Sequence, residues 1–250
     1  MPSFHHGDIE IAYLDEGAGD PIVLVHGFAS TKETNWVSPG WVSTLTRAGR
    51  RVIALDNRGH GQSSKLYDPA LYHTTLLAGD VRALLDHLDI ARADVMGYSM
   101  GARITSFLAV TYPIRVRAAI LGGLGIRLVD GVGLPTSIAE ALEARSLDDV
   151  TDPAGRMFRK FAEQTKSDLR ALAACIRGTR QTLDPDQVAS INVPVLVAAG
   201  TKDDLAGSAH ELAAMMPQGR ALDIPDRDHM LAVGDKVYKE GVLDFLNQRP

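Results

Sequence analysis

The sequence has little cysteine, no excess of basic charge and no long apolar run, and each shortage excludes a class of protein. Cys175 is the one cysteine among 250 residues, so no internal disulfide can form, which is typical of a reducing compartment. The formal net charge is -5, without the basic footprint of a nucleic-acid-binding protein. No apolar stretch is long enough to span a membrane, and the first residues do not read as a signal peptide. These absences predict a cytoplasmic protein that neither binds nucleic acid nor inserts into a membrane.

Motifs for bound cofactors are also lacking. Neither the Gly-x-x-x-x-Gly-Lys-Ser/Thr spacing of a P-loop nor the Gly-x-Gly-x-x-Gly spacing of a dinucleotide site occurs, and Gly59-x-Gly61 alone is a weak signal. Cys175 has no neighbouring histidine or motif that would mark it as a nucleophile, so we interpret it as a buried, unreactive thiol. We therefore expect the protein to use no cofactor and no metal.

What the sequence does contain is a hydrophobic content of 45% and a regular alternation of strand and helix patterns. The patterns that predict strands cover residues 9–14, 21–25, 51–56, 93–96, 118–122, 193–200 and 220–224. The patterns that predict helices cover residues 74–88, 102–110, 208–216 and 237–246. Strands that alternate with helices in this way predict an α/β fold, with a mainly parallel sheet covered by helices on both faces.

The alternation is interrupted between residues 123 and 192, where no strand pattern is clear. Helical stretches are predicted instead at residues 136–145, 154–164, 166–179 and 184–190. Such an insertion lies across the carboxyl ends of the strands, where open α/β sheets bind their ligands. We predict a core formed by residues 1–122 and 193–250, with residues 123–192 as a small helical lid. The alternative is a set of ordinary crossover helices.

The organising motif is Gly97-Tyr98-Ser99-Met100-Gly101, which lies between a predicted strand and a predicted helix. Glycines on either side of Ser99 let other backbone pack closely against a sharp turn that raises the serine. The start of the helix directs N–H groups towards any anion that forms there, so the Met100 N–H is a candidate oxyanion donor. The alternative is that Gly-x-Ser-x-Gly is only a loop, and without the strand before it and the helix after it neither interpretation would be favoured.

A second loop, His26-Gly27-Phe28, follows the strand at residues 21–25. If that strand lies beside the Ser99 strand, the Phe28 N–H is a second oxyanion donor. We interpret His26 as a hydrogen-bonded residue that stabilises the loop, not as a reactive group. Asp56, Arg58 and His60 are likewise interpreted as an ion-pair or capping network beneath the site.

Asp203 and His229 each follow a predicted strand, as Ser99 does. A serine hydroxyl is a poor nucleophile at neutral pH and needs a base, usually histidine, to accept its proton. A carboxylate on the other ring nitrogen fixes the tautomer of that histidine and stabilises its charged form. The order Ser99, Asp203, His229 therefore supplies the groups required for nucleophilic catalysis.

Taken together, these motifs resemble those of the α/β-hydrolase superfamily over nearly the whole chain. The motifs that carry the resemblance are His26-Gly27-Phe28, Asp56-x-Arg58-Gly59-x-Gly61-x-Ser63, Gly97-Tyr98-Ser99-Met100-Gly101, Gly200-x-x-Asp203 and Asp228-His229. The resemblance implies a mostly parallel sheet of eight strands and a variable helical lid that shapes the acyl pocket. It also implies that Ser99 is the nucleophile, His229 the general base, Asp203 its orienting acid, and Phe28 and Met100 the oxyanion-hole donors.

Two positions depart from the family pattern. Many relatives have glycine before the histidine, where this chain has Asp228, and proline shortly after the acid, where this chain has Asp204. Asp204 is therefore a rival of Asp203 for the acid role.

The predicted function is hydrolysis of a small-molecule carboxylic ester with an apolar acyl or alcohol group, through an acyl-enzyme intermediate. The alternatives are carbon–carbon bond hydrolysis, lactone or thioester hydrolysis, perhydrolysis, or ligand sensing with little turnover. The oligomeric state is left open.

Overall fold

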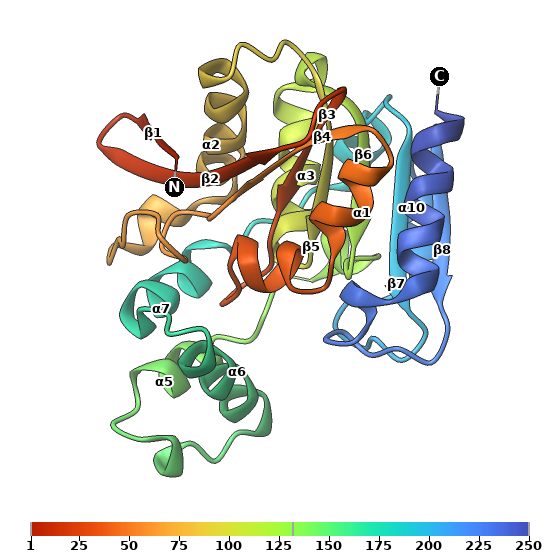
Figure 1. Ribbon diagram of the computed structural model, residues 1–250. Helices are drawn as coiled ribbons and strands as arrows, with labels where there is room; N and C mark the ends of the chain where they lie inside the picture. Colours follow the sequence, from red (N-terminus) through yellow and green to blue (C-terminus); the bar gives the residue numbers. More distant parts are fainter. Residues whose placement is uncertain (1, 132, 250) are drawn as a thin grey trace.

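A sheet of eight strands forms the centre of the protein in the computed structural model, which describes residues 2–131 and 133–249 (Figure 1). The strands are β1 (Ser3–His6), β2 (Ile9–Glu16), β3 (Asp20–Val25), β4 (Arg50–Leu55), β5 (Ala93–Tyr98), β6 (Val116–Gly122), β7 (Val195–Gly200) and β8 (Gly219–Ile224). Their order in the sheet is β1-β2-β4-β3-β5-β6-β7-β8. The pairings of β2 with β1 and β4 are antiparallel, and all the others are parallel. The predicted fold class is thus confirmed.

The central strands are apolar throughout because both of their faces are buried. Side chains alternate between the faces of a strand, and in β3 Val23 and Val25 pack into one core while Ile22 and Leu24 pack into the other. The pairing of β3 with both β4 and β5 fixes the loop after β3 next to the turn after β5. The strand before Phe28 therefore lies beside the Ser99 strand, which is the arrangement that the Phe28 N–H needs to be a second oxyanion donor.

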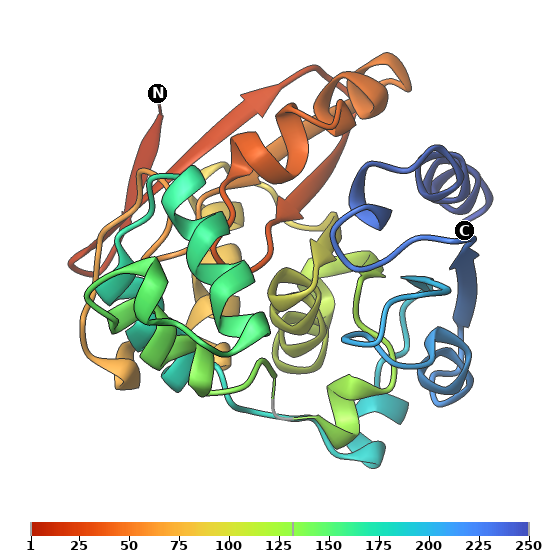
Figure 2. The same ribbon diagram turned by 90° about the horizontal axis from the view of Figure 1, so that it is seen from below.

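Helices cover both faces of the sheet (Figure 2). The longer helices of the two layers are α1 (Trp41–Arg47), α2 (Thr74–His87), α3 (Met100–Thr111), α9 (Ala209–Ala214) and α10 (Lys236–Gln248). Side chains of α2, α3 and α9 belong to one core, and side chains of α1 and α10 belong to the other. Helix α1 and the preceding π-helix at Glu33–Val37 were not predicted from the sequence.

The segment from residue 123 to residue 192 contains helices and, in its described part, no strand. Its helices are α4 (Arg127–Asp130), α5 (Ser137–Glu143), α6 (Pro153–Gln164), α7 (Leu169–Gly178) and α8 (Pro185–Ala189). Helices α5, α6 and α7 pack against one another and form a group below the sheet at the lower left of Figure 1. Helix α8 packs instead on α3, within one of the two cores. That this segment acts as a lid stays a prediction.

Helix α7 begins three residues later than the sequence pattern predicts. Lys166 has a positive φ of 53°, which a helix does not contain. The side chain of Asp168 accepts hydrogen bonds from the N–H groups of Arg170 and Ala171 and so caps the first turn at Leu169. Local capping chemistry, not hydrophobic periodicity, therefore decides where this helix starts.

Candidate active site

Ser99 lies on the sharp turn between β5 and α3. Its φ of 55° and ψ of -115° are unusual for a residue with a side chain and store about 1–3 kcal/mol of strain. The turn is tight because a Cβ on Gly97 would lie 2.1 Å from the Gly101 carbonyl oxygen, and a Cβ on Gly101 would lie 1.9 Å from the Val25 carbonyl oxygen. The glycines are thus required by close backbone contacts on both sides of the serine.

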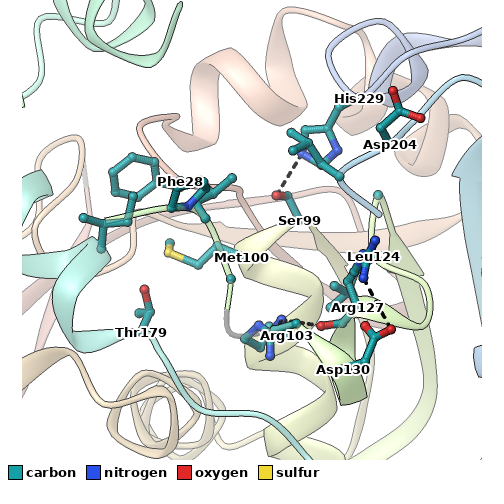
Figure 3. Close-up of a pocket in the computed structure, with 17 residues that line it drawn as sticks. Phe28, Ser99, Met100, Arg103, Leu124, Arg127, Asp130, Thr179, Asp204 and His229 are labelled. Carbon is teal, nitrogen blue, oxygen red and sulfur yellow. Dashed lines mark hydrogen bonds and ion pairs between the residues drawn. The ribbon is translucent and has the colours of Figure 1, made fainter. Parts of the chain in front are cut away.

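Three residues that are distant in the chain meet at this turn. The Oγ of Ser99 lies 2.9 Å from Nε2 of His229, and Nδ1 of His229 lies 2.8 Å from the nearer carboxylate oxygen of Asp203 (Figure 3 shows the Ser99–His229 contact). The carboxylate on Nδ1 favours the tautomer in which Nδ1 carries the proton and Nε2 accepts one. In this arrangement Nε2 can take the hydroxyl proton of Ser99.

The structure distinguishes the two neighbouring aspartates after β7. The carboxylate of Asp203 is buried and also accepts hydrogen bonds from the N–H groups of Leu205 and Ala206 at 3.1 and 3.0 Å. Asp204 is exposed and forms no hydrogen bond with His229, although it lines the same cavity. The geometry required of an orienting carboxylate belongs to Asp203.

Asp228, which stands where many relatives have glycine, has a local backbone role. Its carboxylate accepts hydrogen bonds from the N–H groups of Met230 and Leu231 at 3.0 and 2.9 Å. It therefore shapes the turn that carries His229 and makes no hydrogen bond with the imidazole.

Tyr98 is a supporting residue that the sequence did not reveal. Its hydroxyl donates a hydrogen bond of 2.7 Å to the carbonyl oxygen of His229, and its ring lies 5.5 Å from the imidazole ring. Burial raises the pKa of Tyr98 well above its usual value, so the hydroxyl keeps its proton and remains a donor. The residue directly before Ser99 thereby fixes the loop that carries His229.

The backbone N–H groups of Phe28 and Met100 have no hydrogen-bond acceptor in the described part of the chain, and both residues line a cavity beside Ser99. Two hydrogen bonds hold the loop that carries Phe28 in place. The N–H of Gly27 donates to the side chain of Asn35, and Nε2 of His26 accepts a 3.0 Å hydrogen bond from the N–H of Asn57. His26 is therefore a loop-stabilising residue, as predicted.

The charged residues beneath the loop are paired, as the sequence suggested, but with partners it did not identify. Asp56 pairs with the fully buried Lys32 at 2.6 Å, and Arg58 pairs with the buried Asp80 at 2.6 Å. Cys175 is fully buried, and its Sγ lies 3.8 Å from the sulfur of Met100. Burial raises the pKa of the Cys175 thiol, which makes the thiol unreactive at neutral pH.

Two hollows meet at Ser99 and His229. The larger, of about 400 Å³, extends past Met100 to Arg103 and Leu134. The smaller, of about 160 Å³, is lined by aromatic and apolar side chains together with Ser30, Thr34 and Asn35. The aromatic residues of the smaller hollow are Phe28, Tyr98, Phe158 and Phe161. The site can therefore hold two groups, one on each side of the serine.

No cluster of three or more His, Cys, Asp or Glu side chains in the described residues could hold a metal ion. No helix in the same part of the chain combines the length and apolarity needed to cross a bilayer.

Comparisons with known proteins agree with the fold. A family model described as alpha/beta hydrolase fold matches residues 20–141. BpoC of Mycobacterium tuberculosis, named a non-heme bromoperoxidase, is 32% identical over 248 residues, covering 89% of this chain and 91% of its own. The dihydrolipoyllysine-residue acetyltransferase component of the acetoin cleaving system of Pseudomonas putida is 36% identical over 249 residues. The match covers 92% of this chain but only 64% of that protein.

Among solved structures, the enol-lactonase from Burkholderia xenovorans LB400 superposes with a TM-score of 0.77. It is 26% identical in sequence, and the match covers 99% of this chain and 100% of that chain. The fold, the motifs around Ser99 and these similarities lead to one conclusion: the chain belongs to the α/β-hydrolase fold family.

Proposed function

We propose that the protein is a serine hydrolase that cleaves carboxylic esters through an acyl-enzyme intermediate. The observation that carries the proposal is the hydrogen-bonded chain from Ser99 Oγ through His229 to Asp203 at the edge of a cavity. Histidine and a buried carboxylate in this arrangement are what a serine hydroxyl requires to act as a nucleophile at neutral pH.

In the proposed reaction, Ser99 attacks the ester carbonyl carbon while Nε2 of His229 accepts the hydroxyl proton. The N–H groups of Phe28 and Met100 donate hydrogen bonds to the oxyanion that develops. His229 then gives its proton to the departing alcohol, which leaves an acyl group on Ser99. A water molecule, deprotonated by His229, releases the acid and restores the serine. Apart from the ester and this water molecule, every step uses side chains and backbone groups of this chain.

The helical segment 123–192 has a place in this proposal as a lid. Its residues Leu134 and Ile176 line the larger hollow, and Phe158 and Phe161 line the smaller one. The two hollows would receive the acyl and alcohol groups of the ester. Their mostly apolar walls support an ester with at least one apolar group.

Lactone hydrolysis is a second candidate, because a lactone is a cyclic ester and opens by the same steps. The similarity to a structure described as an enol-lactonase, which extends over the whole chain, favours this candidate.

A p-nitrophenyl ester series of increasing acyl length, assayed with wild type and Ser99→Ala, tests the proposal. A simple lactone is assayed in parallel. Wild type should turn over at least one substrate, and Ser99→Ala should lose about 10³-fold or more in kcat, with an unchanged circular dichroism spectrum. If the variant retains activity, Ser99 is not the nucleophile.

If folded wild type hydrolyses neither esters nor lactones, the proposed reaction is wrong. Carbon–carbon bond hydrolysis, thioester hydrolysis, perhydrolysis and ligand sensing would then be the reactions to examine.

A further inference from the structure

Arg103 is the exception among the buried arginines of the described chain. Arg50, Arg58, Arg103 and Arg159 are all less than one-tenth exposed. Three of them pair with carboxylates: Arg50 with Asp94, Arg58 with Asp80 and Arg159 with Glu163. Arg103 has no carboxylate within ion-pair distance in residues 2–131 and 133–249, although it lines the larger hollow beside Ser99. A buried charge without a counter-ion is costly and therefore suggests that a partner arrives from outside.

Within the described residues, the guanidinium of Arg103 is held by neutral groups only. Its terminal nitrogens donate hydrogen bonds to the carbonyl oxygens of Arg127, Gly131 and Gln181 at 2.7–2.8 Å, with a longer bond to Leu128. Carbonyl groups orient the guanidinium but leave its net charge in place. Burial, together with the charge of Arg180, lowers the pKa of Arg103 to about 10, so the group remains charged at neutral pH.

The position of Arg103 relates it directly to the nucleophile. The backbone N–H of Arg103 donates to the carbonyl oxygen of Ser99 at 3.1 Å, so Arg103 follows Ser99 by about one turn of helix, about 6 Å along the axis. Residues four apart share a helix face, and both line the larger hollow. Figure 3 shows Arg103 at the end of this hollow that is remote from His229 and Asp204.

The other charges along this hollow leave the Arg103 end positive. The charge of Arg127 is compensated by the carboxylate of Asp130, which lies 3.4 Å from a guanidinium nitrogen, and both side chains are about half exposed. The remaining carboxylate, that of Asp204, is exposed and lies on the His229 side. An anionic group would therefore be attracted to the Arg103 end, with the reacting carbonyl at Ser99.

We propose that Arg103 is a specificity-determining residue that favours substrates whose acyl chain ends in a carboxylate, namely half-esters or carboxylate-bearing lactones of short dicarboxylic acids. This inference rests on the proposed ester hydrolysis and adds the charge of the acyl group to it. Because its terminal N–H groups are already engaged, Arg103 acts on the carboxylate mainly through its charge.

The test compares monoethyl glutarate with ethyl glutaramate, in which a neutral amide of the same shape replaces the carboxylate. Release of ethanol is followed for wild type, Arg103→Met and Arg103→Lys. We expect wild type to show a kcat/KM about tenfold higher for the acid than for the amide, mainly through KM. In Arg103→Met this ratio should fall to about 1, and Arg103→Lys, which keeps the charge, should restore part of it.

A double variant, Arg127→Met with Asp130→Asn, serves as the matched control. It removes one charge of each sign from the same hollow and should keep the acid-to-amide ratio of wild type. Should Arg103→Met fail to fold, inhibition of wild type decides the question: glutarate should inhibit at about tenfold lower concentration than the neutral glutaramide.

Three outcomes overturn the inference. One is a ratio near 1 in wild type, another is an Arg103→Met variant that loses activity on both substrates equally, and the third is equal inhibition by glutarate and glutaramide. The second outcome would mean that Arg103 only holds helix α4 and the segment at Gln181 in place through its hydrogen bonds. In each case hydrolysis of the neutral ester would leave the proposed function intact, whereas hydrolysis of neither ester would count against that function itself.

Discussion

At the scale of single residues, the environments of two adjacent aspartates are opposite. Asp203 is 7% exposed, and its oxygens contact the imidazole of His229 and two backbone N–H groups. Asp204 is exposed to solvent and contacts neither. The sequence placed both at the end of a strand and preferred Asp203 by motif position. The hydrogen bonds supply the physical reason for that preference.

Asp203→Asn should lower kcat by about 10³-fold or more, because an amide in place of the carboxylate favours the wrong tautomer of His229 and does not stabilise its charge. Asp204→Asn, the matched control, should retain kcat within about threefold, since an exposed carboxylate is screened by water. Steady-state kinetics of both variants on the best p-nitrophenyl ester provide the measurement. A larger loss in Asp204→Asn would transfer the acid role to Asp204.

At the scale of secondary-structure elements, the turn between β5 and α3 was predictable and helix α1 was not. The turn is specified by glycines whose missing Cβ atoms admit neighbouring backbone. The π-helix and α1 are specified by Trp36 and Trp41, which are fully buried and pack edge to face. Trp41 also packs against Tyr238 of α10 and donates a hydrogen bond to Val233. Such contacts, far apart in the chain, leave no periodic pattern in the local sequence.

Gly101→Ala should destabilise the protein by about 3 kcal/mol, the upper end of the usual cost of overpacking, because the new Cβ would lie 1.9 Å from the Val25 carbonyl oxygen. Gly79→Ala in α2 is the matched control. Its Cβ would meet only His6 at 3.5 Å, and alanine is the better helix former. Urea unfolding measures both variants. Equal stability of Gly101→Ala and wild type would show that the turn is looser than the structure indicates.

At the scale of the whole molecule, the dependence of stability on pH is expected to come from buried histidines beneath the site and not from the two apolar cores. In the described residues the two apolar cores contain no acidic or basic side chain, whereas His26 and His60 beneath the site are fully buried with rings 5.1 Å apart. Burial lowers the pKa of both, in the case of His60 to about 3. His60 is therefore neutral in the folded protein over the pH range in which an unfolded histidine becomes charged.

Stability should consequently fall on mild acidification. An unfolded histidine binds a proton below about pH 6.5, but folded His60 does not do so until about pH 3, so its contribution is complete above pH 6.5 and declines between these values. From pH 7.5 to 5.5 the free energy of unfolding should drop by about 1.4 kcal/mol through His60 alone. Urea titrations at the two pH values measure this drop.

His60→Gln should reduce the drop, while His5→Gln at an exposed position of β1 should leave it as in wild type. An identical drop in His60→Gln and wild type would mean that His60 gains its proton as readily in the folded state as in the unfolded state.

The sequence by itself determined the fold class, because burial on both faces of a parallel sheet leaves continuous apolar runs, and because the turn at Ser99 requires its glycines. It also named Ser99, Asp203, His229, Phe28 and Met100, whose catalytic roles stay predictions, as do the lid boundaries and the cytoplasmic location.

Only the tertiary structure decided which groups meet. Three examples are the contact of Asp203 with His229, the hydrogen bond from Tyr98 to His229, and the position of Arg103 among backbone carbonyl groups. All three depend on how the strands are ordered in the sheet and how the loops at their ends cross. Hydrogen bonds act over a few ångströms, but these three contacts join residues that are 26, 131 and 78 positions apart in the chain. Local patterns in the sequence do not encode those distances.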